Sequence, residues 1–220
     1  KINILFISEG EIKPLINIIK LIFLLKKFDV NSLYIKNKNL KDYLKFKQKD
    51  IRKLKPDYIF IIPSSFELNF DFALNLKDKK KLHNINTNLF SYWKNIINYF
   101  NKFHNAKIYF FDYLKYDLNI FNVNINGTSV DKEIDKLNNN LKINRHFSVD
   151  TINLNILNKK YGTKNSYDLR LSSTFDLEIH PSNYKKVFEY IDHKISISMG
   201  YLKKIIILDL DNTLWGGIIG

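Results

Sequence analysis

The sequence has 220 residues, which is enough for one complete α/β domain and the beginning of a second. Hydrophobic residues make up 45% of it, and the absence of Cys excludes disulfide bonds and thiolate metal sites and suits a reducing, cytoplasmic compartment. The formal net charge is +13. The lysines of the chain are spread through nearly every segment, and the sequence contains no basic helix or zinc knuckle. The charge therefore does not favour nucleic-acid binding.

The first half of the chain predicts strands that alternate with helices. Strands are expected where β-branched and aromatic residues run together, at 2–7, 30–35, 57–62 and 107–111. Apolar residues at helical spacing predict helices at 12–28, 40–54 and 87–103, with a polar loop before the last of them. The unbroken apolar run Leu21–Leu25 is far shorter than the roughly 20 residues of a membrane span, so no span is expected.

The second half continues the alternation less regularly. An Asn-rich loop is expected at 113–127, then a helix from about 130 to 141, a fifth strand at 147–150 and a short helix at 152–160. Pro181 begins a further helix that runs to about residue 197. Strands alternating with helices predict an α/β fold with a doubly wound parallel sheet. We expect residues 1–199 to form this domain and residues 200–220 to begin another.

Two carboxylates end a buried strand near the end of the sequence. The aliphatic run Ile205–Leu208 is followed by Asp209 and Asp211, whose side chains lie on the same side of an extended chain and can share one cation. Ligands of open α/β sheets collect at such strand ends, so the pair predicts a site for Mg²⁺ and a phosphate. The alternative is a loop in which Asp side chains accept local backbone hydrogen bonds.

The spacing of this stretch, Asp-x-Asp-x-Thr after a hydrophobic run, resembles motif I of the haloacid-dehalogenase (HAD) superfamily. Trp215, Gly216 and Gly217 directly after it resemble the FkbH-like branch of that superfamily. The resemblance implies that Asp209 is the nucleophile for the phosphoryl group and that Asp211 is the general acid and base. Both would hold Mg²⁺. The substrate and phosphate loop would comprise Asn212, Thr213, Trp215, Gly216 and Gly217.

The same resemblance implies an enzyme that is a HAD-family phosphatase, phosphotransferase or glyceryl transferase in a biosynthetic pathway. Its substrate would be a phosphorylated small molecule, 1,3-bisphosphoglycerate, and its partner an acyl carrier protein that receives the glyceryl unit. The later HAD motifs have no residues to occupy before Gly220, so we expect the natural chain to continue beyond it. Without their Lys and acidic residues, residues 1–220 alone are expected to be inactive in phosphoryl transfer.

The upstream region resembles the N-terminal domain of FkbH-like proteins, a flavodoxin-like three-layer sandwich akin to SGNH hydrolases. That resemblance gives Ser8, after the first strand, as a nucleophile and His180 as its base. The sequence departs from the SGNH pattern because Ser8 follows Phe6-Ile7 rather than Gly-Asp. Two alternatives to the phosphotransferase therefore stay open, an SGNH-type serine esterase and a non-catalytic domain whose basic face docks the acidic carrier protein.

Overall fold

The computed structural model describes residues 1–101, 106–116, 129–143, 149–157 and 179–201. In this part of the chain the strands form a five-stranded sheet in the order β2-β1-β3-β4-β5, and every neighbouring pair is parallel. The strands are β1 (Ile2–Ser8), β2 (Val30–Lys36), β3 (Tyr58–Ile62), β4 (Lys107–Phe111) and β5 (Val149–Ile152). The predicted α/β class with a doubly wound parallel sheet is confirmed.

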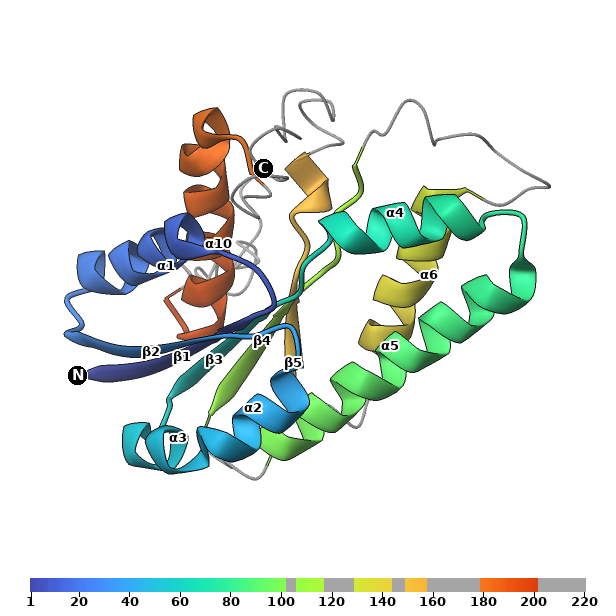
Figure 1. Cartoon of the computed structure of the whole chain (residues 1–220). Helices are drawn as coiled ribbons and strands as arrows, with labels where there is room; N and C mark the ends of the chain where they lie inside the picture. Colours follow the sequence, from blue (N-terminus) through green and yellow to red (C-terminus); the bar gives the residue numbers. More distant parts are fainter. Residues whose placement is uncertain (102–105, 117–128, 144–148, 158–178, 202–220) are drawn as a thin grey trace, which may run out of the picture.

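Helices cover both faces of this sheet (Figure 1). On one face lie α1 (Lys13–Leu25) and α10 (Tyr184–Ser198), which follows a short 3₁₀ turn, η1 (Pro181–Asn183). The other face is covered by α2 (Leu40–Phe46), α3 (Gln48–Leu54), α4 (Phe66–Asn75), α5 (Lys79–Phe100) and α6 (Val130–Ile143). No helix in the described ranges is both long and apolar enough to cross a membrane.

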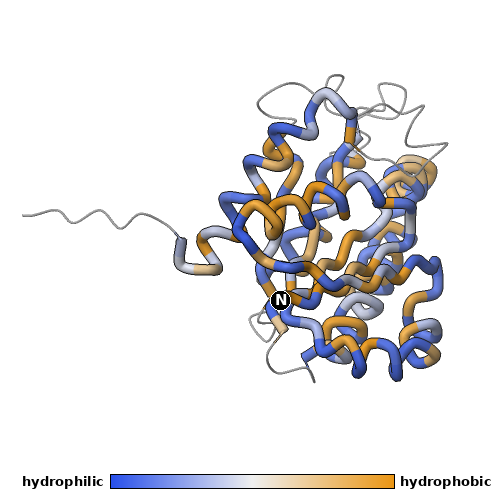
Figure 2. Tube along the Cα trace, turned by 90° about the vertical axis from the view of Figure 1, so that its left-hand side faces the viewer, coloured by the Kyte–Doolittle hydropathy of each residue, from blue (hydrophilic) through white to orange (hydrophobic). Residues whose placement is uncertain are grey.

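The interior strand β1 shows why a strand between two helical layers is mostly hydrophobic. Side chains alternate along a strand, so Ile4 and Phe6 face α1 and α10 while Leu5 and Ile7 face the other helical layer. All four are fully buried because both layers are present. Hydrophobic residues accordingly gather along the interior segments of the trace (Figure 2).

Aromatic rings form a row across the face under α1 and α10. Phe60 of β3 stacks on Phe6 of β1 at 5.6 Å between ring centroids and on Tyr109 of β4 at 5.1 Å. Offset aromatic pairs at such separations stabilise a core by about 0.5–1.5 kcal/mol each beyond the area they bury. The row therefore ties three neighbouring strands together on one face.

Helix α10 packs on α1 and on this aromatic row. Its residues Val187, Ile191 and Ile195 are fully buried at a spacing of four. A polar contact fixes the pair of helices, because the ammonium of Lys26 lies 2.7 Å from a carboxylate oxygen of Asp192. These contacts hold residues from opposite ends of the chain on the same layer.

Helix α10 ends at Ser198, next to the position where the sequence predicts a boundary between two domains. Gly200 has φ +74°, which glycine adopts without a Cβ penalty. The Tyr201 amide donates to the Ser196 carbonyl at 2.9 Å and the Gly200 amide to the Ile197 carbonyl at 3.1 Å. This is a Schellman ending. The expected second domain, and with it the strand before Asp209, lies outside the described residues.

Some predicted helices differ in extent from those observed. The helix expected at 12–28 ends at Leu25, because Lys27 has φ 65° and turns the chain toward β2. The helix expected at 40–54 is two helices, α2 and α3, that meet at Lys47. Its polar middle offers no buried apolar side chain between Leu44 and Ile51.

The prediction of a polar loop before residue 87 is wrong. Helix α4 occupies part of it, with Leu68, Phe72 and Leu76 buried along one side at a spacing of four. Helix α5 begins at Lys79, because the Asp78 side chain caps its N-terminus by accepting from the Lys81 amide at 3.0 Å. The helix ends at Phe100. The fifth strand is also shifted toward the C-terminus, to Val149–Ile152.

Candidate functional site

The carboxyl ends of the parallel strands meet at one edge of the sheet. From β1 the chain passes to β2 on one side, whereas β3 pairs with β1 on the other, so the strand order changes direction between β1 and β3. Open α/β sheets bind ligands outside the strand ends at such a switch point. Glu9 follows β1 and Ser64 follows β3, which places both residues at this point.

Hydrogen bonds hold the turn after β1. The Ser8 hydroxyl accepts from the Gly10 amide at 3.1 Å, and the Tyr34 hydroxyl donates to the Gly10 carbonyl at 2.7 Å. The Ser64 amide donates to the Glu9 carboxylate at 3.3 Å. The hydroxyl of Tyr92 on α5 also hydrogen-bonds to Glu9. Residues far apart in the sequence thus fix the Glu9 side chain at the edge of the sheet.

Burial changes the protonation of Glu9. The pKa of this carboxyl is raised to about 7, mainly by burial and also by the nearby charge of Glu67. The Ser64 amide, the Tyr92 hydroxyl and the charge of Lys38 oppose the shift without cancelling it. Burial and the charge of Glu9 raise the pKa of Tyr92, so its hydroxyl remains a neutral donor. Glu9 therefore exchanges its proton near neutral pH, as an acid–base group does.

A cavity of about 330 Å³ lies beside Glu9. Its walls come from the ends of β1 and β3, from the loop after β2, from α4 and α5, and from the segment after β4. The lining residues are Glu9, Lys38, Ser64, Glu67, Leu68, Asp71, Ile85, Asn88, Leu89 and Tyr113. Among them, the ammonium of Lys38 pairs with the Glu67 carboxylate.

The irregular segment 112–116 after β4 is buried, and polar side chains satisfy its backbone. Asn69 donates to the Leu114 carbonyl at 2.9 Å, and the Leu114 amide donates to the Ser65 hydroxyl at 2.9 Å. Asn138 accepts from the Tyr113 amide at 2.9 Å, and Asn155 accepts from the Lys115 amide at 2.8 Å. Buried backbone groups need such partners, so four side chains position this part of the cavity wall.

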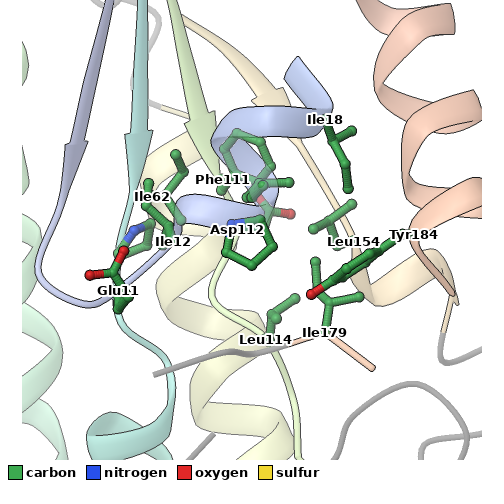
Figure 3. A pocket seen from close by; sticks show the side chains of 13 residues that line it. Glu11, Ile12, Ile18, Ile62, Phe111, Asp112, Leu114, Leu154, Ile179 and Tyr184 are labelled. Atoms are coloured by element: carbon green, nitrogen blue, oxygen red, sulfur yellow. The ribbon is translucent and has the colours of Figure 1, made fainter. Parts of the chain in front are cut away.

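An apolar pocket lies on the other face of the sheet, which α1 and α10 cover, between α1 and the 3₁₀ turn. Figure 3 shows Ile12, Ile62, Phe111, Leu154 and Ile179 around it. Its volume is only about 30 Å³, which holds no more than one or two waters. Asp112 also lines this pocket. Burial raises the pKa of Asp112, and the Lys142 ammonium 2.5 Å away opposes the shift.

Ser8 and His180, the predicted nucleophile and base, lie in the described part of the chain. Ser8 is 1% exposed, and its hydroxyl accepts from Gly10. His180 caps the 3₁₀ turn, with Nδ1 2.7 Å from the Ser182 hydroxyl and 3.2 Å from the Ser182 amide. The hydrogen bonds recorded for the described residues do not join Ser8 to His180.

The predicted phosphoryl-transfer residues lie outside the described residues. These are Asp209, Asp211, Asn212, Thr213, Trp215, Gly216 and Gly217. Within the described ranges, no group of three or more His, Cys, Asp or Glu side chains is placed to hold a metal ion. Glu9 was not predicted from the sequence, although an acidic residue two positions after the first predicted strand was the signal for it.

Comparisons with known proteins show the fold. A structure of the N-terminal part of the protein BF1531 from Bacteroides fragilis, containing a phosphatase domain and complexed with Mg, matches with a TM-score of 0.72 at 18% identity. The match covers 99% of this chain and 57% of the other. The acetyl xylan esterase AlAXEase matches with a TM-score of 0.53 at 14% identity, over 88% of this chain and 100% of the other. No family model matches, and neither does any curated protein.

Proposed function

We propose that this chain is the N-terminal part of an FkbH-like, Mg²⁺-dependent phosphotransferase of the HAD superfamily. The observation that carries the proposal is a match over 99% of the chain to a protein part described as containing a phosphatase domain and complexed with Mg. It agrees with the Asp-x-Asp-x-Thr motif at residues 209–213. The chain spans 57% of that structure, so the activity proposed is that of a longer protein.

The donor atoms of the motif suit the proposed metal. Asp209 and Asp211 offer carboxylate oxygens, and the Asp211 backbone adds a carbonyl oxygen, which are the ligands that Mg²⁺ prefers. Bound there, the ion would neutralise charge on the phosphate. In the proposed step, an oxygen of Asp209 would form a bond to phosphorus while the bond to the leaving oxygen breaks, and Asp211 would give that oxygen a proton. Water would then cleave the bond between Asp209 and phosphorus and release phosphate. Gly216 and Gly217 let the backbone approach the phosphate closely.

The acyl donor and acceptor follow from the FkbH-like motif Trp215-Gly216-Gly217. We assign 1,3-bisphosphoglycerate as the phosphorylated donor and an acyl carrier protein as the acceptor of the glyceryl unit. The parallel-sheet domain at residues 1–199 would then serve as an accessory domain that docks the carrier. Its partner is acidic in this proposal, and the chain's charge of +13 supports such a docking role.

The test compares the longer protein and its Asp209→Asn variant for phosphate release and glyceryl loading with Mg²⁺ and 1,3-bisphosphoglycerate. We expect the variant to lose at least about 10³-fold in rate, because removal of a nucleophile disables the whole mechanism. The matched control is Asp150→Asn, since Asp150 is an exposed carboxylate on β5 that pairs with Lys107 at 2.9 Å. Equal activity of wild type and Asp209→Asn refutes the proposal.

A serine esterase is the second candidate, favoured by the esterase-like fold and by the position of Ser8 at the carboxyl end of β1. In this mechanism the Ser8 oxygen attacks an ester carbonyl, and His180 takes the Ser8 proton and gives it to the alcohol as the ester bond breaks. Water then hydrolyses the acyl-serine. The test is labelling with a serine-directed phosphonate probe. Labelling that is lost in Ser8→Ala and in His180→Ala, and retained in Ser91→Ala, whose serine is exposed on α5, would support it. Wild-type protein that stays unlabelled would refute it.

A further inference from the structure

The cavity beside Glu9 has the size and position of a ligand site. Its volume of about 330 Å³ is within the range of about 300–1,000 Å³ that small-molecule pockets occupy. It lies at the switch point between β1 and β3, and none of its lining residues in the described ranges belongs to the motif for phosphoryl transfer at residues 209–213. A ligand in this cavity therefore requires a function that the motif does not supply.

The charge of the lining is opposite to that of the chain. Three carboxylates, Glu9, Glu67 and Asp71, face one ammonium, Lys38, in a protein whose net charge is +13. The ammonium pairs with Glu67. In the described part of the chain, no Lys or Arg forms an ion pair with Glu9 or Asp71. The charge of Lys38 also lowers the pKa of Glu9, but the lining still carries three carboxylates against this one ammonium.

The rest of the lining includes apolar side chains as well as polar ones. Leu68 of α4 and Ile85 and Leu89 of α5 form the apolar part. Asn88 adds an amide oxygen that accepts hydrogen bonds. A ligand that suits both parts has a donor-rich cationic head and a short hydrocarbon body.

We propose that this cavity binds a small organic molecule carrying a protonated primary amine. Its ammonium group donates to the carboxylates of Glu9 and Asp71, and its hydrocarbon body lies against the apolar wall. Charge-assisted hydrogen bonds of this kind are about twice as strong as neutral ones, so they select the amine over an alcohol of the same shape. The half-buried carboxylate of Glu9, which shares the charge of Lys38 with Glu67, gains a hydrogen-bonded cation of its own from such a ligand.

Protonation of Glu9 makes this binding depend on pH. The groups that face Glu9 are the Ser64 amide, the Tyr92 hydroxyl, Glu67 and Lys38, and Asp71 lines the same cavity. With the pKa of Glu9 at about 7, its carboxylate is mostly ionised at pH 8 and mostly protonated at pH 6. A primary amine keeps its charge over this range. The affinity should therefore rise about tenfold from pH 6 to pH 8.

The experiment is an NMR titration of the 220-residue chain with 2-phenylethylamine and, as its neutral counterpart, 2-phenylethanol. At pH 8 we expect the amine to bind at least about tenfold more tightly than the alcohol. The amine should bind about tenfold more weakly at pH 6, and the alcohol should show little change. Equal affinities for the two compounds, no dependence on pH, or no binding of the amine each overturn the proposal.

Matched variants assign the effect to the cavity. Glu9→Gln keeps the shape of the side chain and should abolish both the preference for the amine and its pH dependence. Glu189→Gln is the control, because Glu189 is exposed on α10 and should leave both unchanged. Asp71→Asn alters an exposed residue and should weaken amine binding about threefold, even if Glu9→Gln fails to fold. Retained preference in both cavity variants refutes the proposal.

These measurements are independent of the proposed phosphotransferase. They need neither turnover nor residues beyond the described ranges, and Asp209→Asn should bind the amine as the wild type does. Failure of amine binding would leave the phosphoryl-transfer proposal intact, and an inactive full-length protein would leave the amine site intact.

Discussion

Replacement of Asn69 by Leu should destabilise the protein strongly, because this amide supports the buried segment after β4. Asn69 is fully buried on α4. Its amide nitrogen donates to the Leu114 carbonyl at 2.9 Å, and its oxygen accepts from the Tyr116 amide at 3.3 Å. Loss of a partner for a buried carbonyl costs about 1–3 kcal/mol, and loss of the second bond about 1 kcal/mol. We expect the free energy of unfolding to fall by about 2–4 kcal/mol.

The assay is urea unfolding followed by circular dichroism. With a slope of about 2 kcal/mol per M, the midpoint should fall by about 1–2 M at unchanged slope. Asn75→Leu is the matched control on the same helix, because Asn75 makes the same type of bond to the carbonyl four residues earlier, at 2.8 Å to Asp71, but bonds no other segment. It should change stability by no more than about 0.5 kcal/mol. Similar losses in the two variants would refute the reasoning.

Two further stability predictions concern Glu9 and α10. Glu9 has a folded pKa of about 7 against an ordinary value of 4.5, so its ionisation is harder in the folded state and stability falls as pH rises through this window. The stability of Glu9→Gln relative to wild type should therefore increase by about 2 kcal/mol from pH 5 to pH 8 in urea unfolding, and a constant difference would contradict this. Ile191→Ala on the buried side of α10 should cost about 2–5 kcal/mol and lower the thermal midpoint, whereas Ile197→Ala, at a 45% exposed position on the same helix, should cost less than about 1 kcal/mol. Equal shifts in the two thermal midpoints would contradict the packing assigned to α10.

The sequence was most informative where burial on two faces imposes a continuous hydrophobic run. The runs at 2–7, 30–35 and 107–111 all became strands, with boundaries shifted by no more than one residue. A strand between two helical layers has no polar side to interrupt its pattern, so composition alone identifies it. The alternation of such runs with helical segments was then sufficient for the fold class.

Helix α4 shows where the pattern was insufficient. Its sequence, Phe-Glu-Leu-Asn-Phe-Asp-Phe-Ala-Leu-Asn, alternates apolar with polar residues over its first turns and contains two Asn, which are poor helix formers. Asn69 nevertheless occupies the buried side, since its amide bonds the loop after β4. Tertiary hydrogen bonds of this kind override local propensity and have no signal in a local window.

The position of the candidate site could be predicted from the sequence, but the residues that determine its chemistry could not. Strand ends in a parallel sheet indicate where a ligand site forms, and Ser8, which the SGNH resemblance gave as a nucleophile, lies directly after the first predicted strand. The neighbouring Glu9 acquires its properties from Ser64 and Tyr92, which lie more than fifty residues away in the chain. Only the folded arrangement brings these groups together and buries the carboxyl.

The aromatic row under α10 has a consequence for synthesis of the protein. Phe6 and Phe60 lie in strands that are complete by residue 62, whereas α10, which covers them together with α1, begins about 120 residues later at Tyr184. At about 5–20 residues per second, a ribosome needs roughly 6–24 s to make that stretch. During this interval the aromatic face of the nascent sheet is only partly covered. Exposed hydrophobic surface of this kind makes a chain prone to aggregation and a substrate for chaperones.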